Sequence, residues 1–397
     1  MIQGADHADH KDFYLETLRD IVSQPTAPFR EERVAARIGA LLRAWDIPFV
    51  VDPTGNIIAH YRRGAPCRPL MLMAHMAHPA FAVVARDDVS PGRLTAQLQG
   101  GVAARCFERV VPVRVYPRAD GAALRGRVVG YRRGAGPREV ELDVAMDDPR
   151  AAADVVPGDF GVWDLPDFDL RDGLIHARVA DDLVGCAAAL LTLWSLAREG
   201  SGADVYGVFT RAEEVGLVGA RAVMRGGLLP REGYVVSLEA SKALPGALQG
   251  AGPVIRVGDR LTTFGDEAEL VLKAAAEEMG SNIWHPALPA TVGVQRQLMS
   301  GGQCEASAAA SLGYSATGLA FPLGNYHNVS DTFGVEAETV HVDDYLTGVA
   351  LLQRAARLMP DEPRLRREAA AAPQRQDHLV ARLEESAEAI QRAAHGA

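Results

Sequence analysis

The chain has 397 residues, which is long enough for two domains or for one large domain with an insertion. Its 48% hydrophobic and 23% charged residues are ordinary for a soluble globular protein. The formal net charge of −10 argues against a general nucleic-acid binder or a protein of anionic membrane surfaces, because both need a basic face.

The N-terminus and the cysteines predict a cytoplasmic protein. Residues 1–7 lack the basic start and the apolar core of a signal peptide. The most apolar run, residues 183–197, is too short to span a bilayer comfortably and is typical of a buried helix. The cysteines contain no C-x-x-C pair and fit a reduced compartment. They are Cys67, Cys106, Cys186 and Cys304.

The first part of the chain predicts two helices, a strand hairpin and a buried strand. Residues 10–24 and 30–45 carry helical periodicity. The stretch 49–59 has two apolar runs around Asp-Pro-Thr-Gly-Asn, which is typical of a hairpin. Residues 69–74 are a short apolar run, consistent with a fully buried strand that ends at His75.

Residues 83–175 have a different sequence pattern, which predicts a small all-β domain. Short alternating runs at 110–115, 124–131 and 140–144 are separated by clusters of Gly, Pro, Asp and Arg. No convincing helical pattern interrupts them before residue 149. Because α/β sequence lies on both sides, we expect an insertion rather than a tandem domain.

Strands and helices alternate after the insertion, which predicts an α/β domain with a mixed, largely parallel central sheet flanked by helices. The catalytic domain is expected to be discontinuous, formed by residues 1–82 and 176–359 around the inserted domain 83–175. Residues 360–397 are expected to be a helical or disordered tail. The expected elements are helix 181–198, strand 203–209, helix 217–225, strand 233–238, helix 266–280 and helix 342–358.

Two adjacent carboxylates, Glu213 and Glu214, follow the predicted strand 203–209. Such a pair is costly at the end of a buried strand unless a positive charge lies beside it. At a frayed strand end, both side chains can converge on one cavity. The pair suits a division of roles in which one Glu binds a metal and the other moves a proton, although an isolated pair is more often part of a solvated loop.

Five side chains of the kind that binds metals lie beside predicted strand ends or at a helix start. Carboxyl ends of strands are where open α/β sheets collect ligands. A helix N-terminus favours negative charge, and a carboxylate there could bridge two cations. Two imidazoles and three carboxylates suit zinc, cobalt or manganese. The five residues are His75, Asp181, Glu214, Glu239 and His327.

Each of these residues alone has a simpler explanation. A lone histidine at a strand end is more often structural, and an Asp at a helix start is usually a cap. All five in chain order, with Glu213 beside a ligand, are harder to obtain by accident. We expect the remaining histidines to be structural or on the surface. They are His7, His10, His60, His176, His285, His341, His378 and His395.

The motifs around the five residues resemble those of one peptidase family. The motifs are Ala74-His75-Met76, Val179–Gly185, Glu213–Ala220, Ser237-Leu238-Glu239 and Tyr326-His327. The chain is similar to the dinuclear-metal aminopeptidases of the glutamyl, leucyl and deblocking type, which include tetrahedral aminopeptidases and endoglucanase-M-like proteins. That family belongs to a wider clan of zinc exopeptidases and acylases. The resemblance spans residues 10–358 and includes the inserted β domain.

The resemblance implies an enzyme with two divalent metal ions per subunit, zinc first, with cobalt or manganese as alternatives. It implies that Glu213 is the general base, which takes a proton from the attacking water and passes it to the leaving amine. Because the inserted domain mediates assembly in this family, a homo-oligomer is expected. The implied ligands are His75 and Glu239 on one side, Glu214 and His327 on the other, and Asp181 bridging.

The first departures from the family pattern concern the ends of two motifs. The family has His-x-Asp where this chain has His75 followed by Met and Ala77, so the Asp that fixes the ligand ring is absent. Losing such a partner typically costs about 10- to 100-fold in metal affinity or activity. The Ala77 side chain cannot replace it, and His78 is expected to point to the other face. The family's Arg after the Asp pair is Leu183 here.

The other departures concern substrate recognition. The family has Asp at the position of Glu239, and elsewhere in the clan a Glu here accompanies carboxypeptidase and acylase chemistry. The family's Gly-Gly-Thr-Asp segment is Gly-Gly-Gln-Cys-Glu at residues 301–305. Gln303 and Glu305 either line the substrate pocket or belong to a surface loop. We do not expect Cys304 to be a nucleophile, because no motif places a His or Asp to activate it.

The sequence therefore predicts a metal-dependent hydrolase of peptide or amide bonds, most simply an aminopeptidase. The first alternative is an N-acyl amino-acid or small-amide hydrolase, motivated by Glu239. The second is a weakly active or inactive homologue that serves as an assembly or binding subunit, motivated by Ala77. The expected partners are a small peptide or amide and further copies of the chain, with no nucleic acid and no membrane.

Overall fold

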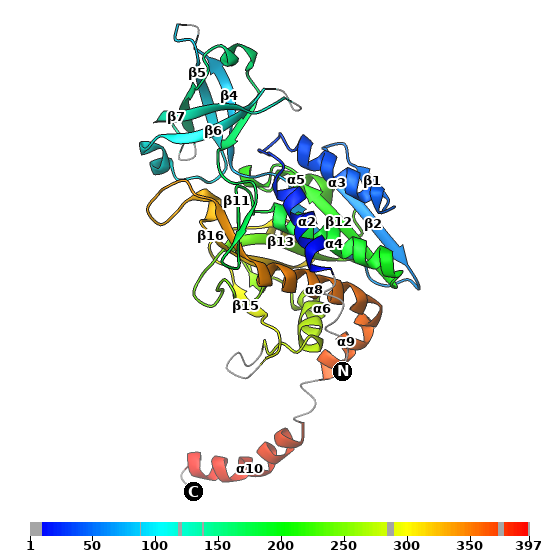
Figure 1. Cartoon of the computed structure of the whole chain (residues 1–397). Coiled ribbons are helices and arrows are strands. Elements are labelled where there is room, and N and C mark those ends of the chain that lie inside the picture. Colours follow the sequence, from blue (N-terminus) through cyan, green and yellow to red (C-terminus); the bar gives the residue numbers. More distant parts are fainter. Residues whose placement is uncertain are drawn as a thin grey trace.

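A computed structural model describes residues 10–87, 89–117, 121–136, 139–283, 290–371 and 377–395. Figure 1 shows a large α/β domain with a small β-barrel at one end. The predicted fold class, a mixed α/β sheet flanked by helices with an inserted all-β domain, is confirmed. Within the described residues, no helix is both long and apolar enough to cross a membrane.

The α/β domain is built on one mixed sheet. Its strands are β1 (Phe49–Val51), β2 (Ile57–Arg63), β3 (Leu70–His75), β10 (Asp169–Arg171), β11 (Leu174–Ala177), β12 (Ala203–Thr210), β13 (Tyr234–Lys242), β14 (Val254–Gly258), β15 (Gln295–Leu298), β16 (Ser315–Gly324) and β17 (Glu338–His341). The spatial order is β1-β2-β12-β3-β13-β16-β17-β11-β10, and off this path β14 pairs with β16 and β15 pairs with β14. The central strands β12, β3, β13 and β16 are parallel. Their carboxyl ends therefore meet at one edge of the sheet.

Helices cover both faces of this sheet. They are α2 (Lys11–Val22), α3 (Glu32–Ala44), α4 (Leu183–Glu199), α5 (Val218–Arg225), α6 (Asp266–Glu278), α7 (Glu305–Ser311), α8 (Val342–Leu358) and α9 (Glu362–Ala371). Along β3, alternate residues point to opposite sides, as a pleated strand requires. Leu70 and Leu72 join a core with α2, α3, α4, α6 and α8. Met71 and Met73 join a second core with α5 and α7.

The barrel closes in the order β4-β5-β8-β7-β6-β9. Its strands are β4 (Ala80–Arg86), β5 (Arg93–Gln99), β6 (Val111–Tyr116), β7 (Leu124–Arg133), β8 (Val140–Met146) and β9 (Phe160–Trp163). Along β8, burial alternates residue by residue, because one face fills the barrel interior. The barrel follows β3 after a short connection, so it begins close to the end of that strand. The division of the chain at residues 83 and 175 stays a prediction.

Several element boundaries differ from those that periodicity predicts. Helix α4 begins at Leu183 rather than 181, because Asp182 caps it by accepting a hydrogen bond from the Gly185 N–H. Strand β13 continues through Glu239 to Lys242, since it pairs with β16 over its whole length. Leu183, where the family has Arg, is fully buried in the core.

The C-terminal segment has two helices in the described residues. Helix α9 packs against α6 in the α/β domain, where Leu365 joins the core. The final helix, α10 (Asp377–His395), has no buried residue. Figure 1 shows α10 apart from the rest of the chain.

Candidate metal centre and active site

His75 is the last residue of β3, and its side chain is only 1% exposed. Its Nδ1 lies 2.8 Å from the backbone carbonyl oxygen of Ala77. A carbonyl can only accept, so Nδ1 carries the proton and the Nε2 lone pair is free to bind a metal. Nε2 lies 3.3 Å from Asp181 Oδ1 and 3.9 Å from Glu213 Oε2. The Ala77 side chain cannot orient the ring, but its main chain does.

Asp181 lies between the two candidate histidine ligands. It comes just before α4, and its peptide bond to Asp182 is cis. Its Oδ1 lies 3.3 Å from His75 Nε2, and its Oδ2 lies 3.6 Å from His327 Nε2. Each carboxylate oxygen therefore faces one imidazole, which is an arrangement that a carboxylate shared by two cations would have.

Glu338 fixes this arrangement, although no sequence motif marks it. Its carboxylate is fully buried at the start of β17. One oxygen accepts from the backbone N–H groups of Ala180 and Asp181, at 2.8 and 3.0 Å. The other accepts from the backbone N–H of His327 at 2.9 Å. A single side chain thus holds both loops that carry Asp181 and His327.

His78 is buried beside the same two loops. Its Nδ1 lies 2.6 Å from the backbone carbonyl oxygen of Asp181, and its Nε2 lies 2.9 Å from Asn328 Oδ1. The Asn328 amide in turn donates to the carbonyl oxygen of Arg178 at 3.0 Å. His78 therefore joins the segments that carry Asp181 and His327, and both of its ring nitrogens are used there rather than at the His75 ring.

Glu213 and Glu214 form a short turn after β12, and buried side chains hold that turn in place. The Glu31 carboxylate accepts from the Ala212 N–H at 2.9 Å and from the Arg211 guanidinium at 2.8 Å. Ala212 has a φ of +50°, so this contact supports an uncommon backbone conformation. As a result, Glu214 Oε2 comes to 3.4 Å from His327 Nε2.

Glu239 approaches from the neighbouring strand β13 and is 6% exposed. Among the described residues, it forms no ion pair with either candidate histidine ligand. Together with Gln303 and Arg256, it lines a small cavity beside the larger one. Among the described residues, His75, Asp181 and Glu214 can each offer a ligand atom within 4.8 Å of the others.

In the part of the chain that the structure describes, several buried carboxylate oxygens in and next to this cluster have no hydrogen-bond partner. An unpaired buried charge is costly, and a bound cation would compensate it. Imidazole nitrogens combined with carboxylate oxygens suit zinc, cobalt and manganese. The donor set therefore fits divalent metal ions. The described oxygens without a hydrogen-bond partner are Asp181 Oδ1, Asp182 Oδ2, Glu214 Oε1 and Glu239 Oε1.

Burial and crowding shift the protonation of these groups. Burial raises the pKa of Glu213 well above its usual range, and burial together with the charge of Asp181 raises the pKa of Glu214 to about 7. Burial opposes the charging of His327, but Glu214 and Asp181 outweigh it and raise its pKa to about 10. A metal ion bound here would have to displace protons from these groups.

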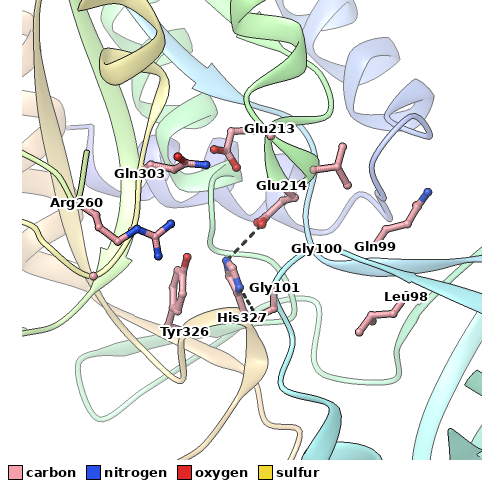
Figure 2. A pocket seen from close by; sticks show the side chains of 14 residues that line it. Leu98, Gln99, Gly100, Gly101, Glu213, Glu214, Arg260, Gln303, Tyr326 and His327 are labelled. Atoms are coloured by element: carbon pink, nitrogen blue, oxygen red, sulfur yellow. Dashed lines mark hydrogen bonds and ion pairs between the residues drawn. The ribbon is translucent and has the colours of Figure 1, made fainter. Parts of the chain in front are cut away.

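A cavity of about 450 Å³ opens beside this cluster. Figure 2 shows Glu213, Glu214 and His327 along its wall, with Gln303 beside Glu213, Tyr326 beside His327, and Arg260 farther along. The inserted barrel also contributes to the wall, through residues 98–101. This volume can hold a small ligand.

Two residues of the 301–305 segment lie outside the cavity wall. Glu305 is fully buried, and its carboxylate accepts from the hydroxyls of Thr210 and Ser237 at 3.0 and 2.9 Å. Cys304 is also fully buried, and burial raises the pKa of its thiol to about 11. A neutral thiol without access to the cavity is a poor nucleophile, as expected.

Comparison with known proteins identifies the family. The family model for the M42 glutamyl aminopeptidase matches residues 55–351. No curated protein matches. The fold is similar to that of a Pyrococcus horikoshii TET1 peptidase, which is 24% identical with a TM-score of 0.69, covering 86% of this chain and 99% of that one.

Two further structures have the same fold. An aminopeptidase from the archaeon Desulfurococcus kamchatkensis is 23% identical with a TM-score of 0.70, covering 89% of this chain and 97% of that one. A Thermotoga maritima protein described as an endoglucanase is 19% identical with a TM-score of 0.64, covering 87% and 99%. The predicted resemblance is therefore confirmed, and the chain belongs to the M42 glutamyl aminopeptidase family of metallo-aminopeptidases.

Proposed function

We propose that this chain is an aminopeptidase that removes N-terminal residues from short peptides at a centre of two divalent metal ions. The observation that carries the proposal is the placement of Asp181, whose two carboxylate oxygens face the Nε2 atoms of His75 and His327. Zinc is the first candidate, and cobalt and manganese suit the same ligands. The metal would be held by His75 and Glu239 on one side, Glu214 and His327 on the other, and Asp181 between them.

The metal site and Glu213 would have different roles in hydrolysis. When bound, the metal ions would lower the pKa of a water molecule and polarise the scissile carbonyl. Glu213 lines the cavity beside Glu214 and is the candidate general base. It would accept the proton of the attacking water and hand it to the leaving amine. It is 9% exposed and lies 3.9 Å from His75 Nε2, which keeps it close to the reacting groups.

Cations at the far side of the cavity favour substrates with an acidic group. Arg260 lines the larger cavity, and Lys242 and Arg256 line the smaller one. Among the described residues, none of the three has an ion-pair partner. Arg256 is 1% exposed and donates from Nη1 to Ser241 Oγ at 3.0 Å, while its Nε atom has no hydrogen-bond partner among the described residues. An acidic N-terminal residue is therefore the preferred substrate side chain.

A second candidate function is supported by Glu239 and by the same cations. In an N-acyl amino-acid hydrolase, the free carboxylate of the product amino acid needs a cationic partner, which Arg260 could provide. A third hypothesis, an inactive homologue, rests on Ala77. The carbonyl of Ala77 accepts the His75 hydrogen bond at 2.8 Å, which favours an active enzyme.

We also propose an assembly state and a cellular location for this protein. The Pyrococcus horikoshii TET1 peptidase can assemble into a tetrahedron or a large octahedral shell. We expect this chain to form a homo-oligomer through its barrel, which sedimentation can test. The cysteines are all free, and a reducing compartment such as the cytoplasm suits them.

The deciding experiment is a mass-spectrometric digest of mixed free and N-acylated peptides with the metal-loaded protein. Loss of single residues from free N-termini is the expected result. Cleavage confined to acylated substrates would favour the acyl amino-acid hydrolase. No cleavage by protein that has bound metal would favour the inactive homologue.

A further inference from the structure

The turn that carries His327 lies between the α/β domain and the inserted barrel. The backbone N–H of His327 donates to the Glu338 carboxylate in the α/β domain at 2.9 Å. Its ring makes a different contact, because Nδ1 lies 3.0 Å from the backbone carbonyl oxygen of Gly101. Gly101 follows β5 of the barrel and precedes His327 by 226 residues. Figure 2 shows this contact beside the cavity.

The Gly101 contact fixes which nitrogen of His327 is available to a metal. The carbonyl can only accept, so the proton that stays on the ring when a metal binds is on Nδ1, and Nε2 is the nitrogen that gives up its proton to become the ligand atom. Nε2 points to Asp181 and Glu214, at 3.6 and 3.4 Å. His75 is oriented in the same way, but by Ala77, two residues further along the chain and just past the end of β3. For His327, the orienting carbonyl comes from another domain.

The short distance between residue 101 and the His327 ring explains why residue 101 is a glycine. A Cβ atom added at Gly101 would lie 3.0 Å from both Cε1 and Nδ1 of the His327 ring. The backbone of Gly101 does not have a positive φ, so the ring is the obstacle to a side chain there. Its neighbour Gly100 is a glycine for another reason, since it has a φ of +96°.

Further contacts attach the His327 segment to the barrel. Val329 and Val335 pack against the hydrophobic core of the barrel. The Arg105 guanidinium lies 4.6 Å from the centre of the Phe333 ring, a cation–π distance. These contacts follow His327 directly in sequence. A shift of the barrel would therefore move the His327 segment as well.

We propose that Gly101 is a positioning residue for the metal centre, and that the inserted barrel is a working part of that centre. The barrel presents the carbonyl that orients His327, so metal affinity on the His327 side depends on how the barrel docks. The inference rests on the proposed two-metal site. It goes beyond that proposal by assigning the barrel a role other than assembly.

The test is a metal titration of Gly101→Ala. Zinc binding is measured by competition with a chelating indicator, and the fold is checked by thermal melting. We expect one of the two zinc sites to weaken by about 10- to 100-fold, the usual cost of disturbing a group that orients a ligand. High zinc concentration should restore the turnover number. The matched control is Gly130→Ala, a barrel position where the nearest atom to an added Cβ is 3.9 Å away.

A second variant keeps the test decisive if Gly101→Ala does not fold. Phe333→Ala removes the ring under Arg105 and leaves His327 itself untouched, so a smaller loss of affinity at the same site is expected. Wild-type zinc affinity in the folded variant that is tested would overturn the inference and leave the proposed function intact. If the wild-type protein itself bound no zinc, the proposed function would fail first.

Discussion

The Nδ1 atom of His75 donates a hydrogen bond to the carbonyl oxygen of Ala77, 2.8 Å away. In the resembled family, an Asp side chain at this position orients the ring. The main chain of this protein therefore supplies an acceptor that the side chain has lost. A neutral carbonyl polarises an imidazole less than a carboxylate does, but it selects the same tautomer.

This contact predicts a limited effect of Ala77→Asp. Because the ring is already oriented, we expect zinc affinity and kcat/KM to rise by less than about 10-fold. The melting temperature should fall, since Ala77 is fully buried and a new carboxylate would lose its hydration. Ala77→Asn adds nearly the same volume without the charge, and so shows which of the two lowers the melting temperature. A gain near 100-fold would mean that the Ala77 carbonyl does not orient His75.

Glu213→Gln should separate proton transfer from metal binding. We expect kcat to fall by about 10²- to 10⁴-fold, because the general base is lost. The metal content should not change, since Glu213 is not a ligand in the proposed centre. Glu214→Gln should instead lose metal. Measured zinc content beside kcat distinguishes the two variants, and loss of metal from Glu213→Gln would contradict the assignment.

Glu338→Gln should weaken metal binding by loosening the two loops that carry Asp181 and His327. Its carboxylate oxygens accept three backbone N–H bonds, whereas an amide has one oxygen to accept with. We expect about 1–3 kcal/mol lower stability and about 10- to 100-fold weaker zinc binding. The control is Glu336→Gln, two residues away and exposed. Wild-type zinc affinity in Glu338→Gln would remove its positioning role.

Arg260→Ala should lower kcat/KM for peptides that begin with Glu or Asp by about tenfold, the order of one exposed charge-assisted hydrogen bond. Peptides that begin with Leu should be unaffected. Arg221→Ala removes an exposed arginine outside the cavity wall and serves as the control. Equal losses for both peptide classes would show that Arg260 does not select the acidic group.

Zinc affinity should increase with pH. In the metal-free protein the pKa of His327 is about 10 and that of Glu214 is about 7, so both hold protons at pH 6. Binding must release those protons, and each one released contributes about a tenfold gain per pH unit. The gain should be steepest below pH 7, where both groups release protons. Chelator competition at pH 6, 7 and 8 checks this, and a flat profile would contradict it.

The sequence predicts the strand-end residues because their physics is local to the sheet. The central strands are parallel, so residues at the ends of β3, β12 and β16 must meet at one edge. His75, Glu214 and His327 follow that rule. Glu239 follows it less closely, because β13 continues past it to Lys242.

The orienting groups could not be predicted in the same way. Glu338 is a single carboxylate at the start of a short strand, and its partners are N–H groups from distant segments. Ala77 and Gly101 act through main-chain carbonyls, which every residue has. Gly101 also differs from turn glycines, since close approach of the His327 ring requires it rather than a positive φ. Only the packing of two domains brings that carbonyl to His327.

The central claim is that Asp181 is shared by two metal ions between His75 and His327. The most direct measurement is a crystal structure of the zinc-loaded protein with anomalous scattering at the zinc edge. We predict two anomalous peaks per chain, one on each side of the Asp181 carboxylate and each within bonding distance of one histidine Nε2. A single peak, or peaks that do not contact Asp181, would contradict it.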